Sequence, residues 1–383
     1  MTLPCQKEFF EIPEDIIYLN CSYLSPLFSA VKEAGVKGIM RKSQPWEIKP
    51  HDFFEQSKEV KQLFAKVTNT SAQNIAIIPS VSYGIGIAAK NLRVSMQQNI
   101  IILEEQFPSN VYPWKELAKK NSAQVITVAR PQNHDWTQAI LDTINKDTAV
   151  VALSHCHWTD GSIIDLKIIG KVCRDKNIPL VIDATQSLGI LDINIKDVQP
   201  AFVIAAGYKW LLGPYSLAFM YVAPEYHDCS PLENNWMNRK GSENFAQLVD
   251  YTNEYAIGAQ RFDMGERSNF ILLPMAIAAL EQILKWGIEN IQSNVESLVN
   301  RIIHFVEKFD LPEKHGFEIL PQNLRCSHIL GLRFENSLPA DFGKKMVERK
   351  VYVSIRSNVI RISPYIYNNE LDCERFANVL SEI

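Results

Sequence analysis

The sequence lacks paired-cysteine motifs, a long basic run, and any apolar run long enough to cross a bilayer. Its seven cysteines are scattered and odd in number, with no CxxC pair, which favours reduced thiols and predicts no metal site. The most apolar run, 270–280, ends at Glu281 and is better interpreted as a buried helix than as a membrane span. A net charge of −4 without a basic run argues against a nucleic-acid partner.

A secretory signal is also missing from the beginning of the sequence. The first residues, MTLPCQKEFFEIPEDII, contain no positively charged stretch that leads into an apolar one. We therefore expect a cytoplasmic protein with no membrane association.

Short β-branched runs alternate with helix-like stretches between about residues 55 and 225. Near-continuous apolar runs are typical of strands that helices cover on both faces. The pattern predicts an α/β fold with a mostly parallel sheet of seven strands. The runs are 75–79, 99–105, 124–129, 149–155, 179–185, 201–206 and 217–222.

A different pattern follows Pro274, where two long helix-like stretches precede the short strands HILGLRF, KVYVSIR and VIRISP. This indicates a smaller α+β domain, and 383 residues exceed the usual size of one core. We predict a large α/β domain over residues 15–265 and a small domain over 266–383. We expect the N-terminal segment 1–14 to join the small domain.

Two charged residues leave neighbouring strands of the predicted sheet, at the edge where such folds bind ligands. Asp183 ends the strand PLVID, and Lys209 follows the strand AFVIAA within GYKWLLGP. A carboxylate there can pair with a protonated heteroaromatic nitrogen, as pyridoxal enzymes require, although a helix-capping aspartate is an equal alternative. A lysine kept partly dry stays neutral and attacks aldehydes, whereas a lone lysine is usually a solvated surface charge.

Other strand ends carry weaker signals. Ser82 stands at a predicted helix start, where free N–H groups bind anions, but capping serines are common there. Phe107 has the shape to stack on a planar ring, but it is more often a core residue. His155 and His157 of SHCHWTDG point to one side if the strand continues, yet no third metal ligand is evident. We interpret His157 and Trp158 as residues that line a cleft.

The ordered motifs FPSNVYPW, SHCHWTDG, VIDATQS, AAGYKW, RFDMG and VIRISPYIYN resemble those of the class V aminotransferase superfamily. This superfamily belongs to the fold-type I pyridoxal-phosphate enzymes. It includes cysteine desulfurases, kynureninases and isopenicillin N epimerase-like proteins. The resemblance extends from about Tyr18 to the C-terminus.

The resemblance implies pyridoxal 5'-phosphate as the cofactor and assigns four residues to its ring. Lys209 would hold the cofactor as a Schiff base, and Asp183 would pair with the pyridine nitrogen. Gln186 would bind the phenolic oxygen. Phe107 stands where the family places its ring-stacking residue.

The resemblance also implies residues for the two anionic groups of the bound molecules. Ser82 with its turn, and Tyr208, would bind the cofactor phosphate. Arg361 matches the arginine that grips the α-carboxylate of the substrate, a task suited to its bidentate fork, and Arg356 is a weaker candidate. The alternative for either arginine is a surface ion pair, but an arginine in an apolar strand requires a partner.

At three places the sequence departs from the family pattern, and these departures limit the activity and the phosphate contacts that we expect. The segment SNVI before Arg361 holds no cysteine, whereas desulfurases carry a catalytic cysteine on a loop there, so we do not expect desulfurase activity. The family's phosphate-site serine is replaced by Ala206. In the family a threonine from the neighbouring subunit often binds the cofactor phosphate, and Glu266 stands at its position here. Ser268 or Asn269 of the partner subunit could take its place at the phosphate.

The resemblance therefore implies an aminotransferase-like enzyme that acts at the α-carbon of an amino acid. It also implies a homodimer with shared active sites. An epimerase or a kynureninase-like Cβ–Cγ hydrolase is the alternative among enzymes. A non-catalytic binding protein is less consistent with an intact pair of Asp183 and Lys209, because a decayed site would lose buried charges first.

Overall fold

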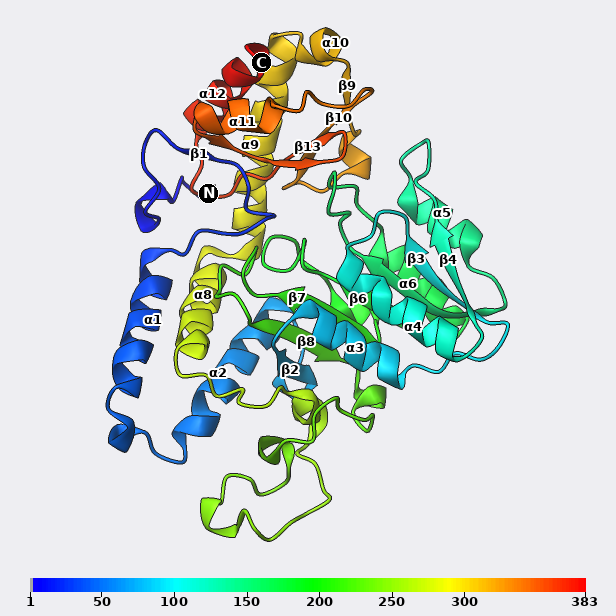
Figure 1. The fold of residues 1–383 in the computed structure, drawn as a ribbon, viewed down its shortest axis with the longest axis vertical. Helices are drawn as coiled ribbons and strands as arrows, with labels where there is room; N and C mark the ends of the chain where they lie inside the picture. The colour runs from blue at the N-terminus through cyan, green and yellow to red at the C-terminus, as the bar shows by residue number, and fades with distance from the viewer. Residues whose placement is uncertain (1–2) are drawn as a thin grey trace.

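The computed structural model describes residues 3–383, and its larger part is built on a seven-stranded sheet (Figure 1). One strand, β8, runs antiparallel to both its neighbours β2 and β7, and the other pairs are parallel. The predicted α/β fold with a mostly parallel sheet of seven strands is confirmed. In spatial order the strands are β2 (Ile75–Ile78), β8 (Ala218–Val222), β7 (Phe202–Ala206), β6 (Leu180–Asp183), β5 (Thr148–Ser154), β3 (Asn99–Leu103) and β4 (Gln124–Val128).

Hydrophobic side chains cover both faces of this sheet. Ile75 and Ile77 belong to one apolar cluster, whereas Ala76 and Ile78 of the same strand belong to the cluster on the other face. Such two-sided burial explains why the strands have continuous apolar sequences. The surrounding helices are α1 (Ser29–Lys42), α2 (Asp52–Val67), α3 (Val81–Asn91), α4 (Tyr112–Lys120), α5 (Trp136–Thr143), α6 (Leu166–Asp175), α7 (Ile195–Val198) and α8 (Leu272–Trp286).

A smaller part contains a four-stranded antiparallel sheet and its own apolar cluster. Strand β1 (Ile17–Tyr18) pairs with β11 (Val351–Tyr352), so this early strand lies with the C-terminal part (Figure 1). The sheet order is β12 (Ser354–Arg356), β13 (Val359–Ile362), β10 (Leu330–Phe334) and β9 (Phe317–Ile319). The helices are α9 (Ile288–Lys308), α10 (Leu311–His315), α11 (Phe342–Glu348) and α12 (Glu370–Ser381).

The two parts of the chain meet through α8 and α9. Helix α8 packs against α1 and α2, whereas α9 packs against α12, and Gly287 separates the two helices. The division near residue 265 stays a prediction. Among the helices of residues 3–383, none combines the length and the apolar character that crossing a bilayer requires.

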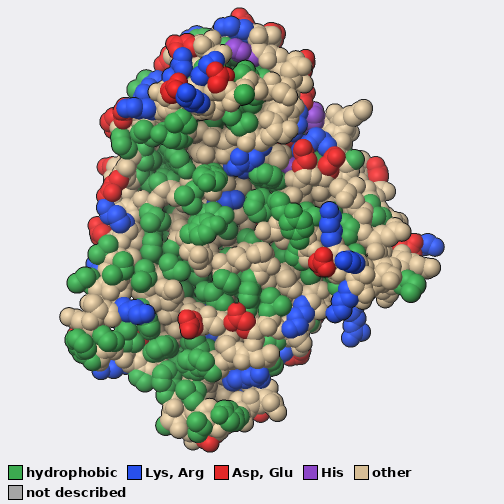
Figure 2. All heavy atoms as spheres, viewed as in Figure 1, with side chains coloured by type: hydrophobic (Ala, Val, Ile, Leu, Met, Phe, Trp, Pro, Cys, Tyr) green, Lys and Arg blue, Asp and Glu red, His purple; other side chains and the backbone are tan. Residues whose placement is uncertain are grey.

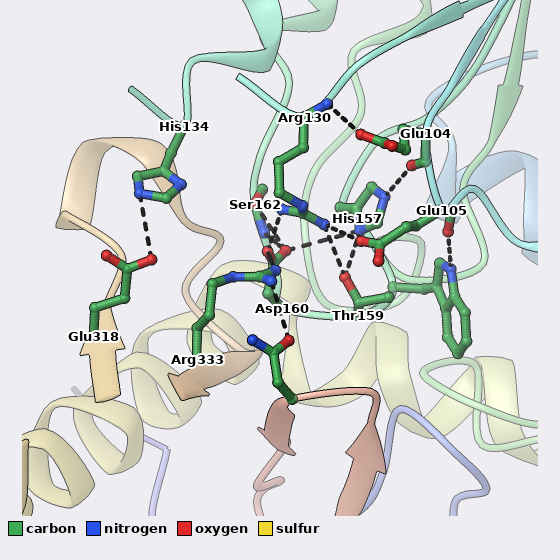
Figure 3. A network of polar contacts seen from close by, with 12 residues as sticks. Glu104, Glu105, Arg130, His134, His157, Thr159, Asp160, Ser162, Glu318 and Arg333 are labelled. Carbon is green, nitrogen blue, oxygen red and sulfur yellow. Dashed lines mark hydrogen bonds and ion pairs between the residues drawn. The ribbon is translucent and has the colours of Figure 1, made fainter. Parts of the chain in front are cut away.

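A buried carboxylate connects the two sheets at their junction (Figure 3). One oxygen of Asp160 lies 2.6 Å from Arg130 Nη1 of the large part and 2.8 Å from Arg333 Nη2 of β10. Gly331 faces the same residue, and a Cβ there would lie 2.8 Å from the Asp160 backbone. The small sheet thus docks closely on the loop that follows β5, which brings β13 to the carboxyl edge of the large sheet.

Candidate active site

A cavity of about 300 Å³ opens at the carboxyl ends of the parallel strands. Residues from the ends of β2, β3, β5, β6 and β7 line it, as is usual for ligand sites in such sheets. The structure brings seven of the predicted site residues to this cavity: Ser82, Phe107, Trp158, Asp183, Gln186, Tyr208 and Lys209.

Lys209 follows directly after β7, at a turn that requires a glycine. A Cβ on Gly207 would lie 2.7 Å from the carbonyl oxygen of Leu217, so a larger residue would push the turn apart. The Lys209 side chain is buried, with its amine 5.7 Å from the ring centre of Phe107. Burial and then the positive charge of Arg361 lower the pKa of Lys209 to about 8, although Asp183 acts in the opposite direction. The neutral fraction of this amine near neutral pH is therefore larger than that of an ordinary lysine.

Asp183 ends β6 and is buried in the same cavity wall. Its Oδ1 accepts the backbone N–H of Thr185 at 3.0 Å, so the residue fixes the turn after the strand. Burial raises the pKa of Asp183, opposed by its hydrogen bonds to Thr185 and by the charge of Lys209. Such a carboxylate gains stability from a cationic partner that enters the cavity.

Gln186 is held by three contacts around the turn after β6. Its Oε1 accepts the indole N–H of Trp210 at 2.8 Å, and its Nε2 donates to the carbonyl of Ser22 at 3.1 Å. Its own backbone carbonyl contacts His328 Nε2 at 2.6 Å. The amide is therefore fixed in orientation at the cavity wall, with one N–H of Nε2 left for a ligand.

The end of the cavity near α3 carries hydroxyl groups. Ser80 caps the helix by accepting the N–H of Tyr83 at 3.2 Å, and its hydroxyl lies 2.9 Å from that of Ser82. The free N–H groups of an eleven-residue helix and two hydroxyls favour an anion at this place. Ser216, two residues before β8, also lines the cavity.

Two aromatic side chains form one wall. The ring of Phe107 meets that of Trp158 edge to face at 5.4 Å, and 40% of Phe107 remains exposed. The indole N–H of Trp158 donates to the carbonyl of Glu105 at 2.6 Å, which fixes the ring. Phe107 thus presents an exposed face toward the cavity that contains Lys209.

His157 does not line the cavity, in contrast to its predicted place in the cleft. Its ring stacks on Trp136. It also contacts the hydroxyl of Thr159 at 2.8 Å and the carbonyl of Glu104 at 3.0 Å (Figure 3). Strand β5 ends at Ser154, so the alternation expected for residues 155–157 no longer applies. Burial lowers the pKa of His157, which keeps the ring a neutral part of the network around Asp160.

Arg361 on β13 lies behind the cavity wall and is 1% exposed. Its guanidinium donates to the carbonyl of Trp158 at 2.6 Å and to the hydroxyl of Ser354 at 3.2 Å. No carboxylate within residues 3–383 forms an ion pair with it, and its Nε has no partner there. Burial and the nearby charge of Arg356 lower the pKa of Arg361 to about 9, so it remains a cation at neutral pH.

Arg356 lies on β12, with its guanidinium 5.3 Å from the ring centre of Trp158. Its Nη1 donates to the carbonyl of Ile355, and the side chain is half-buried. Both candidate arginines thus contact or approach Trp158, although neither lines the cavity itself.

Glu266, Ser268 and Asn269 do not reach the cavity of their own chain. Asn269 accepts two backbone N–H groups at the beginning of α8, and Ser268 is buried against Met237. Ala206, at the family's serine position, lines the cavity without a hydroxyl.

Sequence reasoning missed several residues that line the cavity. Thr185 lies one residue beyond Ala184 in the DATQS motif and accepts the N–H of Ala206 at 3.3 Å. Tyr215 and Ser216 precede β8, and because this strand is antiparallel, its beginning lies at the carboxyl edge of its neighbours. Tyr215 and Ser216 could have been predicted only if the sequence had shown that β8 runs antiparallel to its neighbours. Cys156, after β5, also lines the cavity.

Comparison with known proteins identifies the family. The model for the aminotransferase class-V family matches residues 49–376. The chain is 24% identical to an uncharacterized aminotransferase, YcbU, of Bacillus subtilis over 90% of its length and 86% of that protein. It is 24% identical to a probable cysteine desulfurase of Pyrococcus abyssi, over 97% of this chain and 95% of that one.

A solved structure has the same fold. A variant of the protein C-DES, with glycine covalently linked to its PLP cofactor, superimposes with a TM-score of 0.87 at 16% identity. The match covers 98% of this chain and 99% of that chain. These findings confirm the predicted family, fold class and cofactor. The chain belongs to the class V aminotransferase family and is a pyridoxal-phosphate-dependent enzyme of fold type I.

Proposed function

We propose that this enzyme acts at the α-carbon of an amino acid and transfers its amino group. The observation that carries the proposal is the buried cavity in which Lys209 and Asp183 face a common space, with the unpaired cation of Arg361 behind its wall. These three groups are the nucleophilic amine, the acidic partner and the carboxylate receptor that such chemistry requires.

The residues present fit pyridoxal 5'-phosphate. Asp183 supplies a buried acceptor for a protonated ring nitrogen, and the hydroxyls of Ser80, Ser82 and the α3 N-terminus supply donors for a phosphate. Phe107 offers a partly exposed aromatic face at the same cavity. When bound, the cofactor accepts the electrons of a bond broken at the α-carbon of the substrate.

The chain's own residues supply the remaining steps. Nζ of Lys209 would hold the cofactor, and its neutral amine would remove the α-proton of the substrate and return a proton as general acid. Its lowered pKa, about 8, suits both directions of transfer near neutral pH. Asp183 holds the proton of the ring nitrogen. Gln186, fixed by Trp210 and Ser22, orients the ring through its remaining N–H.

The substrate carboxylate is assigned to Arg361. A buried guanidinium without an anionic partner is costly, and a carboxylate that enters the cavity offsets this cost through a bidentate contact. Arg356 contributes a second positive charge near Trp158. Holding the carboxylate in a fixed plane determines which bond at the α-carbon stands perpendicular to the cofactor ring.

A cysteine desulfurase requires an accessible thiol that accepts sulfur, and the turn between β12 and β13, Ser357–Asn358, contains none. Cys156 lines the cavity but is 1% exposed. An epimerase or a kynureninase-like hydrolase remains the alternative, since both reactions use the same lysine and aspartate.

We also propose that two copies of the chain form a homodimer. Hydrophobic side chains gather on the face that carries α1 and the segment between β8 and α8 (Figure 2). The exposed ones include Val36, Ile39, Met40, Trp46, Val249, Tyr251 and Ile257. Patches of this kind mark protein interfaces, and the family resemblance implies a second copy as the occupant.

The half-reaction tests the proposed chemistry. The enzyme loaded with cofactor and given a panel of amino acids without a keto-acid acceptor should release about one keto acid per chain, since amino transfer stops there. Lys209→Ala should lower this rate at least 100-fold, about the lower limit for loss of a general acid–base. Chromatography of keto acids measures both. Incorporation of solvent deuterium at the α-carbon without keto acid would instead favour epimerisation.

The pH dependence of Lys209 follows from its surroundings. In the cofactor-free protein, reductive methylation of Lys209 by formaldehyde should reach half its maximal rate near pH 8, because the neutral amine reacts. Arg361→Met should move this midpoint upward by removing a positive charge, and Asp183→Asn should move it downward. Mass spectrometry of the labelled peptide provides the rates. The labelling rate of exposed Lys167 is measured in the same sample for comparison, and its midpoint should lie at higher pH because Asp197 raises the pKa of Lys167. A Lys209 midpoint above pH 10 would contradict the assigned environment.

The carboxylate assignment predicts a selective loss of binding. Arg361→Met should lower kcat/KM for the preferred amino acid about 10- to 100-fold, the range for loss of a charge-assisted hydrogen bond. The effect should fall mainly on KM. The reaction with the corresponding amine, which has no carboxylate, should change little. Arg349→Met, on an exposed arginine between α11 and β11, is the control. Equal losses for the amino acid and the amine would refute the role.

The dimer predicts twice the mass of one chain in sedimentation equilibrium. Ile39→Glu should increase the dissociation constant at least tenfold, because it places a charge in an apolar contact. Leu371→Glu on α12 is the matched control, since Ile39 is 56% exposed and Leu371 is 58% exposed. A monomeric wild-type protein at micromolar concentration would contradict the proposal.

A further inference from the structure

Three potential metal ligands meet at the cavity wall, next to Gln186, and none of the three is assigned to the cofactor. They are Cys156, after β5, together with Cys326 and His328, which precede β10. One ligand atom from each lies within 4.8 Å of the other two. All three side chains are at most 1% exposed. Because the residues are distant in the sequence, their spacing gave no sign of this cluster.

Backbone contacts hold the two segments together. The N–H of Cys326 donates to the carbonyl of Gly161 at 2.8 Å, and that of Ile163 donates to Leu324 at 3.1 Å. A bridge between Ser162 and Arg325 continues the pairing. The position of the two thiols therefore depends on a short backbone ladder, and a ligand would meet a preformed arrangement.

The orientation of His328 is fixed and leaves one nitrogen free. Its Nε2 lies 2.6 Å from the carbonyl oxygen of Gln186, which can only accept, so Nε2 carries the hydrogen. Nδ1 is consequently a buried acceptor, and it has no hydrogen-bond partner within residues 3–383. Trp210 packs edge to face on the ring at 4.6 Å. A histidine that donates its outer N–H to a carbonyl is arranged as metal-bound histidines are.

We propose that Cys156, Cys326 and His328 bind a Zn²⁺ ion. Two thiolates and one neutral imidazole form a soft ligand set that Zn²⁺ prefers and that Mg²⁺ and Ca²⁺ avoid. Two thiolates cancel the charge of the dication, so the buried group is neutral and requires no further counter-ion. Binding displaces both thiol protons into solution, and three protein ligands leave a fourth position for water.

The ion would stabilise the wall of the active site. His328 is hydrogen-bonded to Gln186, whose side chain lines the cavity, and Cys156 lines it as well. The bound ion would also connect the loop after β5 to the segment that precedes β10, at the same junction as the ion pairs of Asp160. Bound zinc should therefore raise the melting temperature of the protein and alter the absorption band of the bound cofactor. The proposal does not rest on the reaction assigned above, and Lys209→Ala should bind zinc normally.

The test uses the full chain with its cofactor, freed of metal by dialysis against a chelator and then titrated with Zn²⁺. Calorimetry and elemental analysis should give one tightly bound ion per chain. Cys326→Ser and His328→Gln should each weaken binding more than about 100-fold, since loss of even an outer partner costs about 10- to 100-fold. In the wild type, Co²⁺ should produce the visible bands of a tetrahedral thiolate site, a readout independent of variant folding.

Two control variants distinguish this cluster from other binding. Cys173→Ser removes a buried thiol on α6, and His51→Gln removes an exposed ligand beside Asp52 and Glu55. Both should bind zinc as the wild type does. The proposal fails if the wild type retains no stoichiometric zinc and gives no Co²⁺ thiolate bands, or if Cys326→Ser and His328→Gln bind as tightly as the wild type. A Cys156–Cys326 disulfide in the freshly purified protein, in place of the ion, would also overturn it.

Discussion

Two basic side chains are buried at the active site, Lys209 in the wall of the cavity and Arg361 behind it, and Asp183 is the acidic side chain that lines the cavity. Removing charged groups from water costs several kcal/mol per ion unless partners replace the lost hydration. Here the replacement is incomplete, because Arg361 donates to a carbonyl and a hydroxyl rather than to a carboxylate. Burial, and then the charge of Arg361, lower the pKa of Lys209 to about 8, and the excess of basic groups over Asp183 favours the binding of anions. A phosphate ester and an amino-acid carboxylate are both anions that such a site can bind.

This arrangement depends on the docking of the small sheet. Lys209 comes from the end of β7 in the large sheet, whereas Arg361 comes from β13 in the small one. Asp160 connects the two through Arg130 and Arg333. Although burial acts to raise its pKa, His157, Arg130 and the hydrogen bonds from Ser162 lower the pKa of Asp160 and keep it ionised. The ion pairs at the junction therefore support the spacing of the two cations as well as the packing of the fold.

The comparisons show how far the fold persists at low sequence identity. At 16% identity the superposition still reaches a TM-score of 0.87, since the apolar pattern of a doubly covered sheet accepts many sequences. The chemistry depends on fewer positions. In this chain the loop between β12 and β13 holds no thiol, Ala206 offers no hydroxyl to the cavity, and three side chains of metal-ligating type meet at the cavity wall.

The sequence by itself determined the sheet and the principal residues of the cavity. Strands buried on both faces have continuous apolar runs, and all seven predicted runs coincide with observed strands to within a few residues. Asp183 and Lys209 were identifiable because parallel strands bring their carboxyl ends to one edge. The assigned roles of these residues stay predictions.

Only the tertiary structure decided the rest, because it depends on contacts between distant segments. The antiparallel direction of β8 brings Tyr215 and Ser216 to the cavity, and the early end of β5 turns His157 away from it. The meeting of Cys156 with Cys326 and His328 follows from the docking of the small sheet on the loop after β5. Local sequence patterns carry no information about such approaches, since the free energy that fixes them comes from packing and hydrogen bonds between segments far apart in the chain.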